Sequence, residues 1–217
     1  MMGHAPPGSK MVGEGQFPLW GAGVTPLYLL RHGPLPRAQG SAPLGSSNPA
    51  VHPEAWALWP QVKADLQGLQ PQRVLCSDLT RSRDLALDLG LPTLVLSGLQ
   101  EQSFGEWEGI PWVEIKGHES FLANPVISSP PGGESFARCA SRAVLTIQGA
   151  LDGETPTLVL AHGGPLRAIL AHFLGMGLDR ALDLAWAPFG LSKLEIYGPN
   201  RGVLRYHNRI LPTVKPT

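Results

Sequence analysis

The sequence has few cysteines, no excess of either charge and no long apolar run, and each of these scarcities excludes a class of protein. Its 217 residues include only two cysteines, Cys76 and Cys139, which are too few for a disulfide framework. Both have apolar neighbours, so we expect free, buried thiols in a reducing compartment. Lysine plus arginine and aspartate plus glutamate each number 17, so the net charge gives no reason to expect binding to nucleic acid or to an anionic membrane.

Targeting and membrane-spanning segments are also missing from the sequence. The first 26 residues contain six glycines and four prolines, without the basic start and apolar run of a signal peptide. No stretch reaches the roughly 18 consecutive apolar residues that a spanning helix needs. We therefore expect a flexible extension over residues 1–26, a single domain over residues 27–217, and a soluble, cytoplasmic protein.

The sequence also lacks cysteines and histidines that are spaced as metal ligands. The sequence has no C-x-x-C pair, and five histidines show no spacing typical of metal ligands: His4, His52, His118, His172 and His207. We predict neither a metal nor a cofactor. His52 precedes a predicted helix and is the one of these five that we consider a candidate substrate contact.

Apolar segments alternate with amphipathic ones along the rest of the chain. Short apolar runs predict strands at 27–30, 73–76, 93–96 and 157–161, and two further runs at 191–197 and 203–207 predict a terminal hairpin. Helical spacing or capping residues predict helices at 55–69, at 135–149 and from a Ser77 or Asp78 cap to Leu89. The segment His162-Gly163-Gly164-Pro165 leads into a further predicted helix that runs through Leu174, with proline in its first turn. Pro60 predicts a kink or a late start in the first helix. The alternation predicts an α/β fold, a three-layer sandwich in which helices flank a mostly parallel central sheet.

Residues suited to phosphate chemistry lie at or near the ends of predicted strands. These residues are Arg31, His32, Arg81 and His162. Ligands collect beyond the carboxyl ends of parallel strands, so adjacent strands would gather these side chains around one crevice. Guanidinium groups match phosphate oxygens bidentately, and the N–H groups of the Gly163-Gly164 turn would favour an anion at a helix start. A neutral imidazole is a competent nucleophile, so we expect His32 to attack phosphorus while an acid protonates the leaving oxygen.

Five ordered motifs resemble those of the histidine phosphatase superfamily, which includes cofactor-dependent phosphoglycerate mutases, fructose-2,6-bisphosphatases and α-ribazole phosphatases. The resemblance covers about Leu27 to Asn208 and is strongest to α-ribazole phosphatase-like members. It implies a phosphoglycerate mutase-like fold and metal-independent phosphatase activity. The motifs are Leu30-Arg31-His32-Gly33, Ser77-Asp78-Leu79-Thr80-Arg81-Ser82, the segment 99–109 (LQEQSFGEWEG), Pro131-Gly132-Gly133-Glu134-Ser135 and His162-Gly163-Gly164.

The resemblance also implies roles for individual residues. His32 would be phosphorylated, Glu101 would be the proton donor, and the phosphoryl group would be bound by Arg31, Arg81, His162 and Gly163. A carboxyl group beside a phosphate dianion is kept protonated, as an acid catalyst requires. Glu106 and Glu108 are nearby competitors for the acid role. We expect Trp107 and Trp112 to fill the core and Ser135 to cap a helix.

The loop after the nucleophile departs from the family pattern. Family members commonly follow the first glycine with an acidic residue, then threonine, then asparagine three positions later, whereas this chain has Pro34, Leu35 and Ala38. Arg37 is a candidate replacement for the lost substrate contacts. The departure weakens the assignment of a substrate more than that of the mechanism.

These features predict hydrolysis of a small phosphorylated metabolite, with α-ribazole 5′-phosphate as one candidate, and they predict no oligomeric state. The first alternative is a phosphoglycerate mutase-type phosphotransferase, but mutases of this family use a cationic insertion to hold the substrate. The corresponding stretch from Gly109 to Gly132 has Lys116 as its one lysine or arginine. The second alternative is a phosphate-binding or interaction module that has lost turnover, which the altered loop motivates.

Overall fold

A six-stranded sheet forms the centre of the computed structural model, which describes residues 23–35 and 42–212. The strands are β1 (Thr25–Arg31), β2 (Arg73–Cys76), β3 (Thr93–Val95), β4 (Thr157–Ala161), β5 (Gly190–Gly198) and β6 (Arg201–Ile210). Their spatial order is β3-β2-β4-β1-β5-β6. The first four run parallel, and the β5–β6 hairpin pairs with β1 in the antiparallel sense. The predicted mostly parallel sheet and terminal hairpin are confirmed.

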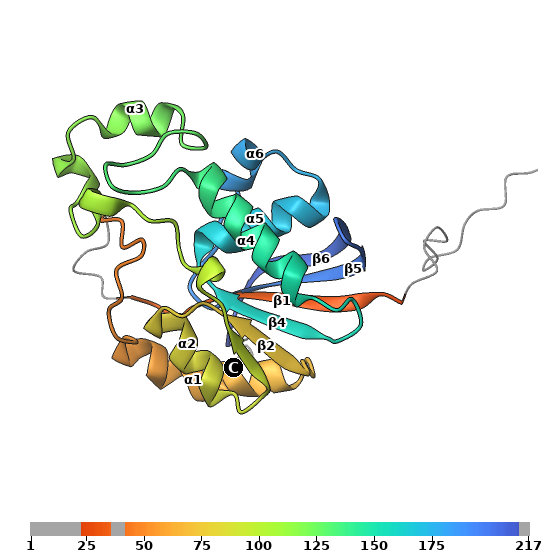
Figure 1. Ribbon diagram of the computed structural model, residues 1–217. Coiled ribbons are helices and arrows are strands. Elements are labelled where there is room, and N and C mark those ends of the chain that lie inside the picture. The colour runs from red at the N-terminus through yellow and green to blue at the C-terminus, as the bar shows by residue number, and fades with distance from the viewer. Residues whose placement is uncertain (1–22, 36–41, 213–217) are drawn as a thin grey trace, which may run out of the picture.

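Helices cover both faces of the sheet and complete three layers (Figure 1). Helices α1 (Pro53–Gln67) and α2 (Thr80–Asp88) lie on one face, while α4 (Phe136–Ala150) and α5 (Gly163–Leu174) lie on the other. Successive strand residues serve opposite faces, since Leu30 packs with α1 and α2 and Leu29 packs with α4 and α5. Burial on both faces explains why β1 and β4 are almost entirely apolar.

Several predicted boundaries are corrected by the structure. Strand β1 begins at Thr25, so the last two residues of the predicted extension belong to the sheet, while residues 1–22 lie outside the described chain. Helix α1 begins at Pro53, upstream of Pro60, so the late start predicted there is wrong. Proline at the first helical positions leaves no N–H unsatisfied, which explains the early start.

The predicted cap of α2 is also wrong. The N-cap residue is Leu79, and Ser77 Oγ instead accepts a hydrogen bond from Leu79 N at 3.2 Å. The cap comes from a distant loop, where Asn48 Oδ1 accepts from Thr80 N at 2.7 Å. In α4 the predicted cap is confirmed, because Ser135 Oγ accepts from Arg138 N.

A projecting segment between β3 and α4 holds an aromatic cluster of its own. It contains short 3-10 helices at Ser97–Leu99, Gly105–Trp107 and Trp112–Glu114, followed by α3 (His118–Ala123), which stands apart from the sheet in Figure 1. Trp107 and Trp112 contact each other and Phe121 here, with ring centroids 5.4–6.1 Å apart. Both tryptophans are only partly buried, so the prediction that they fill the core is wrong.

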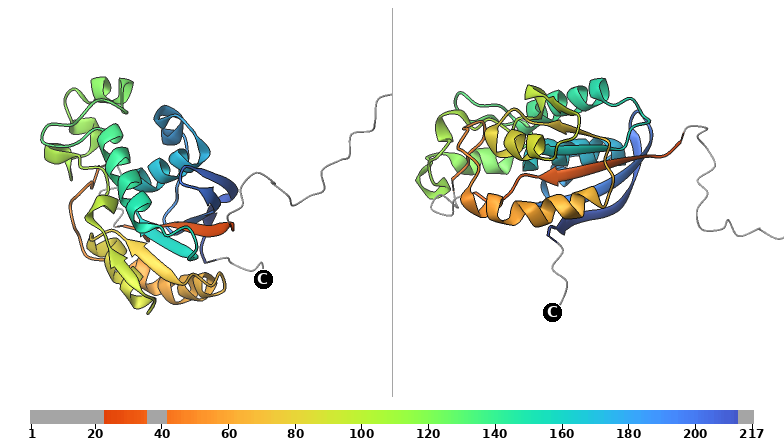
Figure 2. Two further views of the ribbon diagram at one scale, coloured as in Figure 1. Left: turned by 45° about the vertical axis from the view of Figure 1, so that its right-hand side comes forward. Right: turned by 90° about the horizontal axis from the view of Figure 1, so that it is seen from below.

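Views from other directions show the same layers around the central sheet (Figure 2). The short helix α6 (Leu178–Leu182) follows α5 on the same side. Cys76 and Cys139 are buried and free, as predicted. No helix in residues 23–35 and 42–212 has the length and apolarity needed to cross a membrane.

Candidate active site

His32 and His162 lie side by side because each follows the carboxyl end of one of two paired strands. Arg31 is the register partner of Ala161, and His32 N donates to Ala161 O at 3.0 Å. The two imidazole ring centroids are 5.0 Å apart, and both residues are buried, with 3% and 0% of their surface exposed. The predicted convergence at the sheet edge is therefore confirmed for both histidines.

The tautomer of His32 follows from its backbone neighbour. Nδ1 lies 2.7 Å from Gly33 O, and a carbonyl oxygen only accepts, so Nδ1 carries the hydrogen. Burial holds the pKa of His32 well below its usual value, and the charges of Arg31 and Arg81 lower it further. The ring is therefore neutral near pH 7, and its Nε2 keeps a free lone pair.

Two arginines are anchored beside this ring by backbone carbonyls. Arg31 donates through Nη1 to Trp186 O, while Arg81 donates through Nη1 and Nη2 to Ser47 O and Gly45 O at 2.6 and 2.7 Å. Arg81 is 2% exposed and forms no surface pair with Asp78 or Asp84. Carbonyl acceptors fix the guanidinium positions without neutralising their charge, which leaves that charge to act on an anion.

Buried nitrogens without partners gather at the same place. Arg31 Nε, Arg81 Nε and both ring nitrogens of His162 are buried and make no hydrogen bond. Burial, followed by the nearby charges, lowers the pKa of His162 well below its usual value, so this ring is neutral as well. Buried polar groups without partners are costly in a folded protein. These nitrogens of Arg31, Arg81 and His162 are therefore suited to an anionic ligand with several acceptor oxygens.

Glu101 closes the site from the side of α5. Its Oε1 accepts from Gln102 N and Gly164 N, both at 2.9 Å, and its backbone carbonyl accepts from Arg142 Nη2 at 2.9 Å. The N–H of Gly164 is thereby used by the carboxylate, so the expectation that both glycines offer N–H groups to an anion is wrong for Gly164. Gly163, the first residue of α5, donates to none of the acceptors in the described chain.

The structure separates the two other glutamates of this segment. Glu106 is exposed. Glu108 accepts hydrogen bonds from the backbone N–H groups of Ser46, Ser47 and Phe104 at 2.7–2.9 Å and from the hydroxyls of both serines. Burial would raise the pKa of Glu108, but these hydrogen bonds outweigh it and lower the pKa. A carboxylate held ionised in this way is unsuited to donate a proton.

Two candidate substrate contacts are less well placed by the structure. Arg37 lies outside the described residues. His52 is the N-cap residue of α1, with its Nδ1 buried and 4.0 Å from Glu54 Oε2. Helix α1 approaches the nucleophile loop, since a methyl group built on Gly33 would lie 2.6 Å from Ala55 Cβ.

The sequence prediction missed two arginines at the site. Arg142 of α4 donates to the carbonyls of Gly98 and Gln100 at 2.9 and 2.7 Å and pairs with Glu134, so it fixes the segment that carries Glu101. Arg167 of α5 lies one turn after Gly163 and donates through Nε to Leu184 O at 2.8 Å. The i+4 spacing from Gly163 was the available signal for Arg167.

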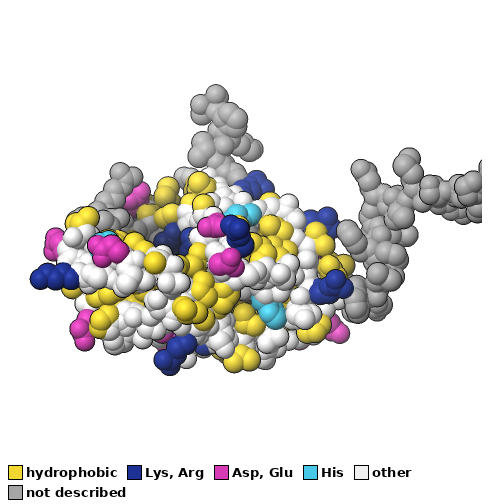
Figure 3. All heavy atoms as spheres, turned by 90° about the horizontal axis from the view of Figure 1, so that it is seen from above, with side chains coloured by type: hydrophobic (Ala, Val, Ile, Leu, Met, Phe, Trp, Pro, Cys, Tyr) yellow, Lys and Arg dark blue, Asp and Glu magenta, His cyan; other side chains and the backbone are white. Residues whose placement is uncertain are grey.

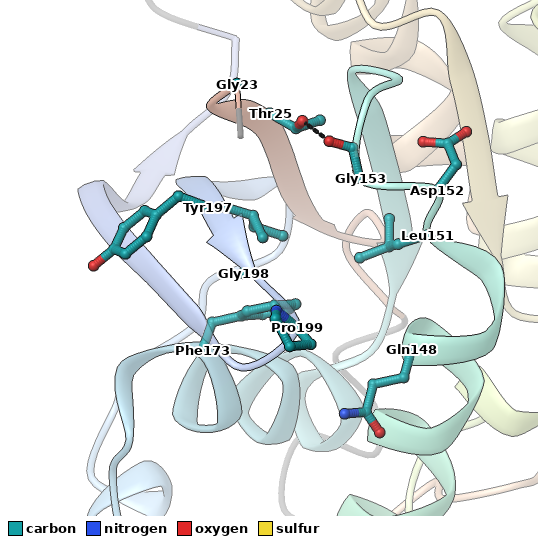
Figure 4. A pocket seen from close by; sticks show the side chains of 11 residues that line it. Gly23, Thr25, Gln148, Leu151, Asp152, Gly153, Phe173, Tyr197, Gly198 and Pro199 are labelled. Atoms are coloured by element: carbon teal, nitrogen blue, oxygen red, sulfur yellow. Dashed lines mark hydrogen bonds between the residues drawn. The ribbon is translucent and has the colours of Figure 1, made fainter. Parts of the chain in front are cut away.

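A separate cavity of about 360 Å³ lies at the opposite end of the sheet (Figure 4). It is lined by residues from the start of β1, the loop between α4 and β4, and the β5–β6 turn, among them Thr25, Gly153 and Pro199. Thr25 Oγ1 donates to Gly153 O at its edge. His32 and His162 follow the carboxyl ends of β1 and β4, whereas this cavity lies at the other ends, so the cavity is separate from the candidate site.

On the face seen in Figure 3, basic and acidic side chains are interspersed, and neither sign forms a broad patch. Among the described residues, no three histidine, cysteine, aspartate or glutamate side chains are grouped as metal ligands would be. The concentration of positive charge is therefore local to the buried site.

Comparison with known proteins places this geometry in one family. The model of the histidine phosphatase superfamily, branch 1, matches residues 27–209. A glucosyl-3-phosphoglycerate phosphatase of Mycolicibacterium vanbaalenii is 27% identical over 173 residues, which cover 72% of this chain and 77% of the relative.

Two solved structures share the fold. The α-ribazole phosphatase of Shigella flexneri has a TM-score of 0.77 at 20% identity, and the match covers 88% of this chain and 100% of that one. A phosphoserine phosphatase of Entamoeba histolytica in complex with 3-phosphoglyceric acid has a TM-score of 0.75 at 18% identity, covering 86% and 98% of the two chains. With the family match over residues 27–209, the chain belongs to the histidine phosphatase superfamily and is a hydrolase of phosphate esters.

Proposed function

We propose that the chain hydrolyses phosphate monoesters of small metabolites through a phosphohistidine formed on His32. The observation that carries this proposal is the free Nε2 of a neutral, buried His32 beside four buried nitrogens without partners. Those nitrogens belong to Arg31, Arg81 and His162 and are suited to hold the phosphoryl oxygens. Gly163 N–H is a further candidate donor at the helix start.

In the first step, Nε2 of His32 attacks phosphorus and the bond from phosphorus to the ester oxygen breaks. The proton of the Glu101 carboxyl group passes to the departing oxygen, and the alcohol leaves. In the second step, water attacks phosphorus, Glu101 accepts the proton of the water, and the N–P bond breaks. Phosphate leaves and His32 returns to its neutral form, so the cycle needs no metal.

Two substrate classes fit what is known of the chain. α-Ribazole 5′-phosphate is the candidate suggested by the sequence, and the Shigella structure supports only the shared fold. The glucosyl-3-phosphoglycerate phosphatase is more similar in sequence and favours a phosphorylated hydroxy acid. His52 is a candidate contact for either substrate, because α1 adjoins the nucleophile loop.

Two alternative functions remain distinct from hydrolysis. A mutase would have to hold a phosphorylated acid in two orientations, and Lys116 is the one lysine or arginine from Gly109 to Gly132. A phosphate-binding module without turnover would not need a proton donor, yet Glu101 is positioned by the N–H groups of Gln102 and of Gly164 in the first turn of α5.

The decisive experiment compares the full chain with His32→Ala on p-nitrophenyl phosphate in the presence of a chelator. We expect wild-type turnover and a loss of about 10³-fold or more in kcat for the variant, as for removal of a covalent nucleophile. Equal rates would exclude a nucleophilic role for His32, and an inactive wild type would favour the binding module. Conversion of 3-phosphoglycerate into its 2-isomer would support the mutase instead.

A further inference from the structure

We infer that Arg167 binds a carboxylate on the leaving group of the substrate, so that the preferred substrate is the phosphate ester of a hydroxy acid. This inference rests on the proposed hydrolase function, because it needs an ester whose leaving group passes beside Glu101.

Arg167 reaches the start of its own helix. A methyl group built on Gly163 would lie 2.9 Å from Arg167 Nη1 and 3.7 Å from Glu101 Oε2, so both groups border the same small space. Side chains in a helix point toward its N-terminus, and Arg167 follows Gly163 by one turn. The guanidinium of Arg167 therefore lies beside the first turn of α5, immediately after His162.

The free oxygen of Glu101 indicates which part of a substrate would meet Arg167. Oε1 is engaged by two backbone N–H groups, whereas Oε2 accepts no hydrogen bond from the described residues. A general acid must lie within hydrogen-bond reach of the oxygen that it protonates. Oε2 would therefore face the leaving oxygen, and a cation beside Oε2 would adjoin the leaving group rather than the phosphoryl oxygens held at His32 and His162.

Arg167 has donors to spare, unlike the other arginine on this side of the site. Arg142 is occupied by Glu134 and by three carbonyls of the segment 98–101. Arg167 makes one hydrogen bond, from Nε to Leu184 O, and forms none of the ion pairs found in the described part of the chain. Its two Nη groups are thus oriented by one anchored nitrogen and left free.

The two free Nη groups of Arg167 are suited to bind a carboxylate. Two parallel N–H groups of a guanidinium match the two oxygens of a carboxylate. Burial lowers the pKa of Arg167, the carboxylate of Glu101 opposes this effect, and the charge of Arg31 adds to it. Since the net effect still disfavours the charged guanidinium, a second anion beside Arg167 would stabilise it. A hydroxyl at the same place would accept only one of the two hydrogen bonds.

The test compares two esters with the same three-carbon skeleton. 3-Phosphoglycerate carries a carboxylate where glycerol 3-phosphate carries a hydroxymethyl group. We expect wild type to have a kcat/KM about tenfold or more higher for the acid, and Arg167→Gln to lose this preference mainly through KM, since a charged hydrogen bond accounts for about a tenfold factor. The variant should lose less kcat/KM on glycerol 3-phosphate than on 3-phosphoglycerate, because the first ester has no carboxylate.

Two further variants make the result specific. Arg180→Gln removes an exposed arginine on the neighbouring helix α6 and should leave both kcat/KM values unchanged. Arg167→Lys keeps the charge without the paired donors and should retain part of the preference. Far-UV circular dichroism and thermal melting check that each variant is folded.

The outcomes that overturn the inference differ from those that overturn the proposed function. An equal loss on both esters in Arg167→Gln would make Arg167 a general structural residue, and the absence of any wild-type preference for the acid would remove the carboxylate contact. If wild type turns over p-nitrophenyl phosphate but neither three-carbon ester, the inference also fails while the phosphatase proposal stands. Loss of aryl phosphate turnover in wild type would instead contradict the proposed function.

Discussion

The carboxylate of Glu108 connects its own segment, which includes Phe104, to the loop 45–47, and through that loop to Arg81. It accepts hydrogen bonds from Ser46, Ser47 and Phe104, and the carbonyls of Gly45 and Ser47 in turn hold the guanidinium of Arg81. Glu108 also favours the charged form of Arg81 electrostatically, although burial is the larger influence on the pKa of Arg81 and lowers it. Glu108 therefore controls the position of Arg81, a buried arginine suited to bind phosphate.

Replacement of Glu108 by glutamine should weaken phosphate binding. The new amide NH₂ would face serine donors that need an acceptor, so the loop 45–47 would shift and Arg81 would lose its anchoring. We expect KM for p-nitrophenyl phosphate and the inhibition constant of inorganic phosphate to rise about tenfold, and the free energy of unfolding to fall by about 1–3 kcal/mol. Steady-state kinetics and urea denaturation measure the two effects.

Glu106→Gln provides the matched control, because Glu106 lies in the 3-10 turn that Glu108 directly follows and is exposed. Its kinetic constants should stay within about twofold of wild type and its unfolding free energy within about 0.5 kcal/mol. An equal effect of the two variants would show that net charge rather than the hydrogen bonds of Glu108 matters.

At the scale of elements, the nucleophile loop packs closely against helix α1 and against the segment just before β5. A methyl group on Gly33 would lie 2.6 Å from both Ala55 Cβ of α1 and Phe189 Cζ, just before β5. Phe189 N also donates to His32 O at 3.2 Å. The glycine after His32 is therefore required by the close approach of these elements.

Gly33→Ala should push α1 and the segment at Phe189 apart and displace His32. We expect the free energy of unfolding to fall by about 1–3 kcal/mol, as for other overpacked sites, and kcat to fall at least tenfold. Gly149→Ala, in α4 with open space around the added methyl group, should be neutral or stabilising by up to about 1 kcal/mol. An active and fully stable Gly33→Ala protein would contradict this description of the loop.

The elements that sequence reasoning predicted best are those with strong local signals. Strands β1 and β4 are short apolar runs because both faces of the sheet are covered, and α5 ends at the predicted Leu174. The cap of α2 could not be found, because Asn48 lies 32 residues before Thr80 in the chain. The separate aromatic cluster of Trp107, Trp112 and Phe121 was missed for another reason, because periodicity does not distinguish one hydrophobic cluster from another.

At the site, the sequence predicted which residues take part better than it predicted which atoms they contact. The motifs placed His32, Arg81 and His162 in one crevice, and the strand register explains why they converge. The use of Gly164 N–H by Glu101 was not predictable, because both groups could equally have faced a phosphate. Contacts of this kind depend on the loop geometry of the folded chain.

At the scale of the whole molecule, two buried neutral histidines make stability depend on pH. The folded-state pKa values of His32 and His162 lie well below the ordinary 6.5, which the unfolded chain retains. The unfolded state therefore binds more protons as the pH falls below about 6.5, and stability present above that pH is lost on acidification. Each histidine contributes a slope of up to about 1.4 kcal/mol per pH unit.

This linkage is measured by urea unfolding between pH 7 and pH 5.5. We expect the free energy of unfolding to fall with pH more steeply in wild type than in His32→Ala, because the variant has one histidine fewer to protonate on unfolding. Parallel pH dependences in the two proteins would show that His32 is not held neutral in the folded state.

The central claim is that phosphorus is transferred to Nε2 of His32, and trapping the intermediate tests it most directly. The full chain is mixed rapidly with a ³²P-labelled aryl phosphate, quenched in alkali and digested, and the labelled peptide is mapped by mass spectrometry. The account predicts alkali-stable, acid-labile label on His32, formed within the first turnover and absent from His32→Ala. Label on another residue, or first-turnover hydrolysis in wild type with no labelled protein, would contradict it.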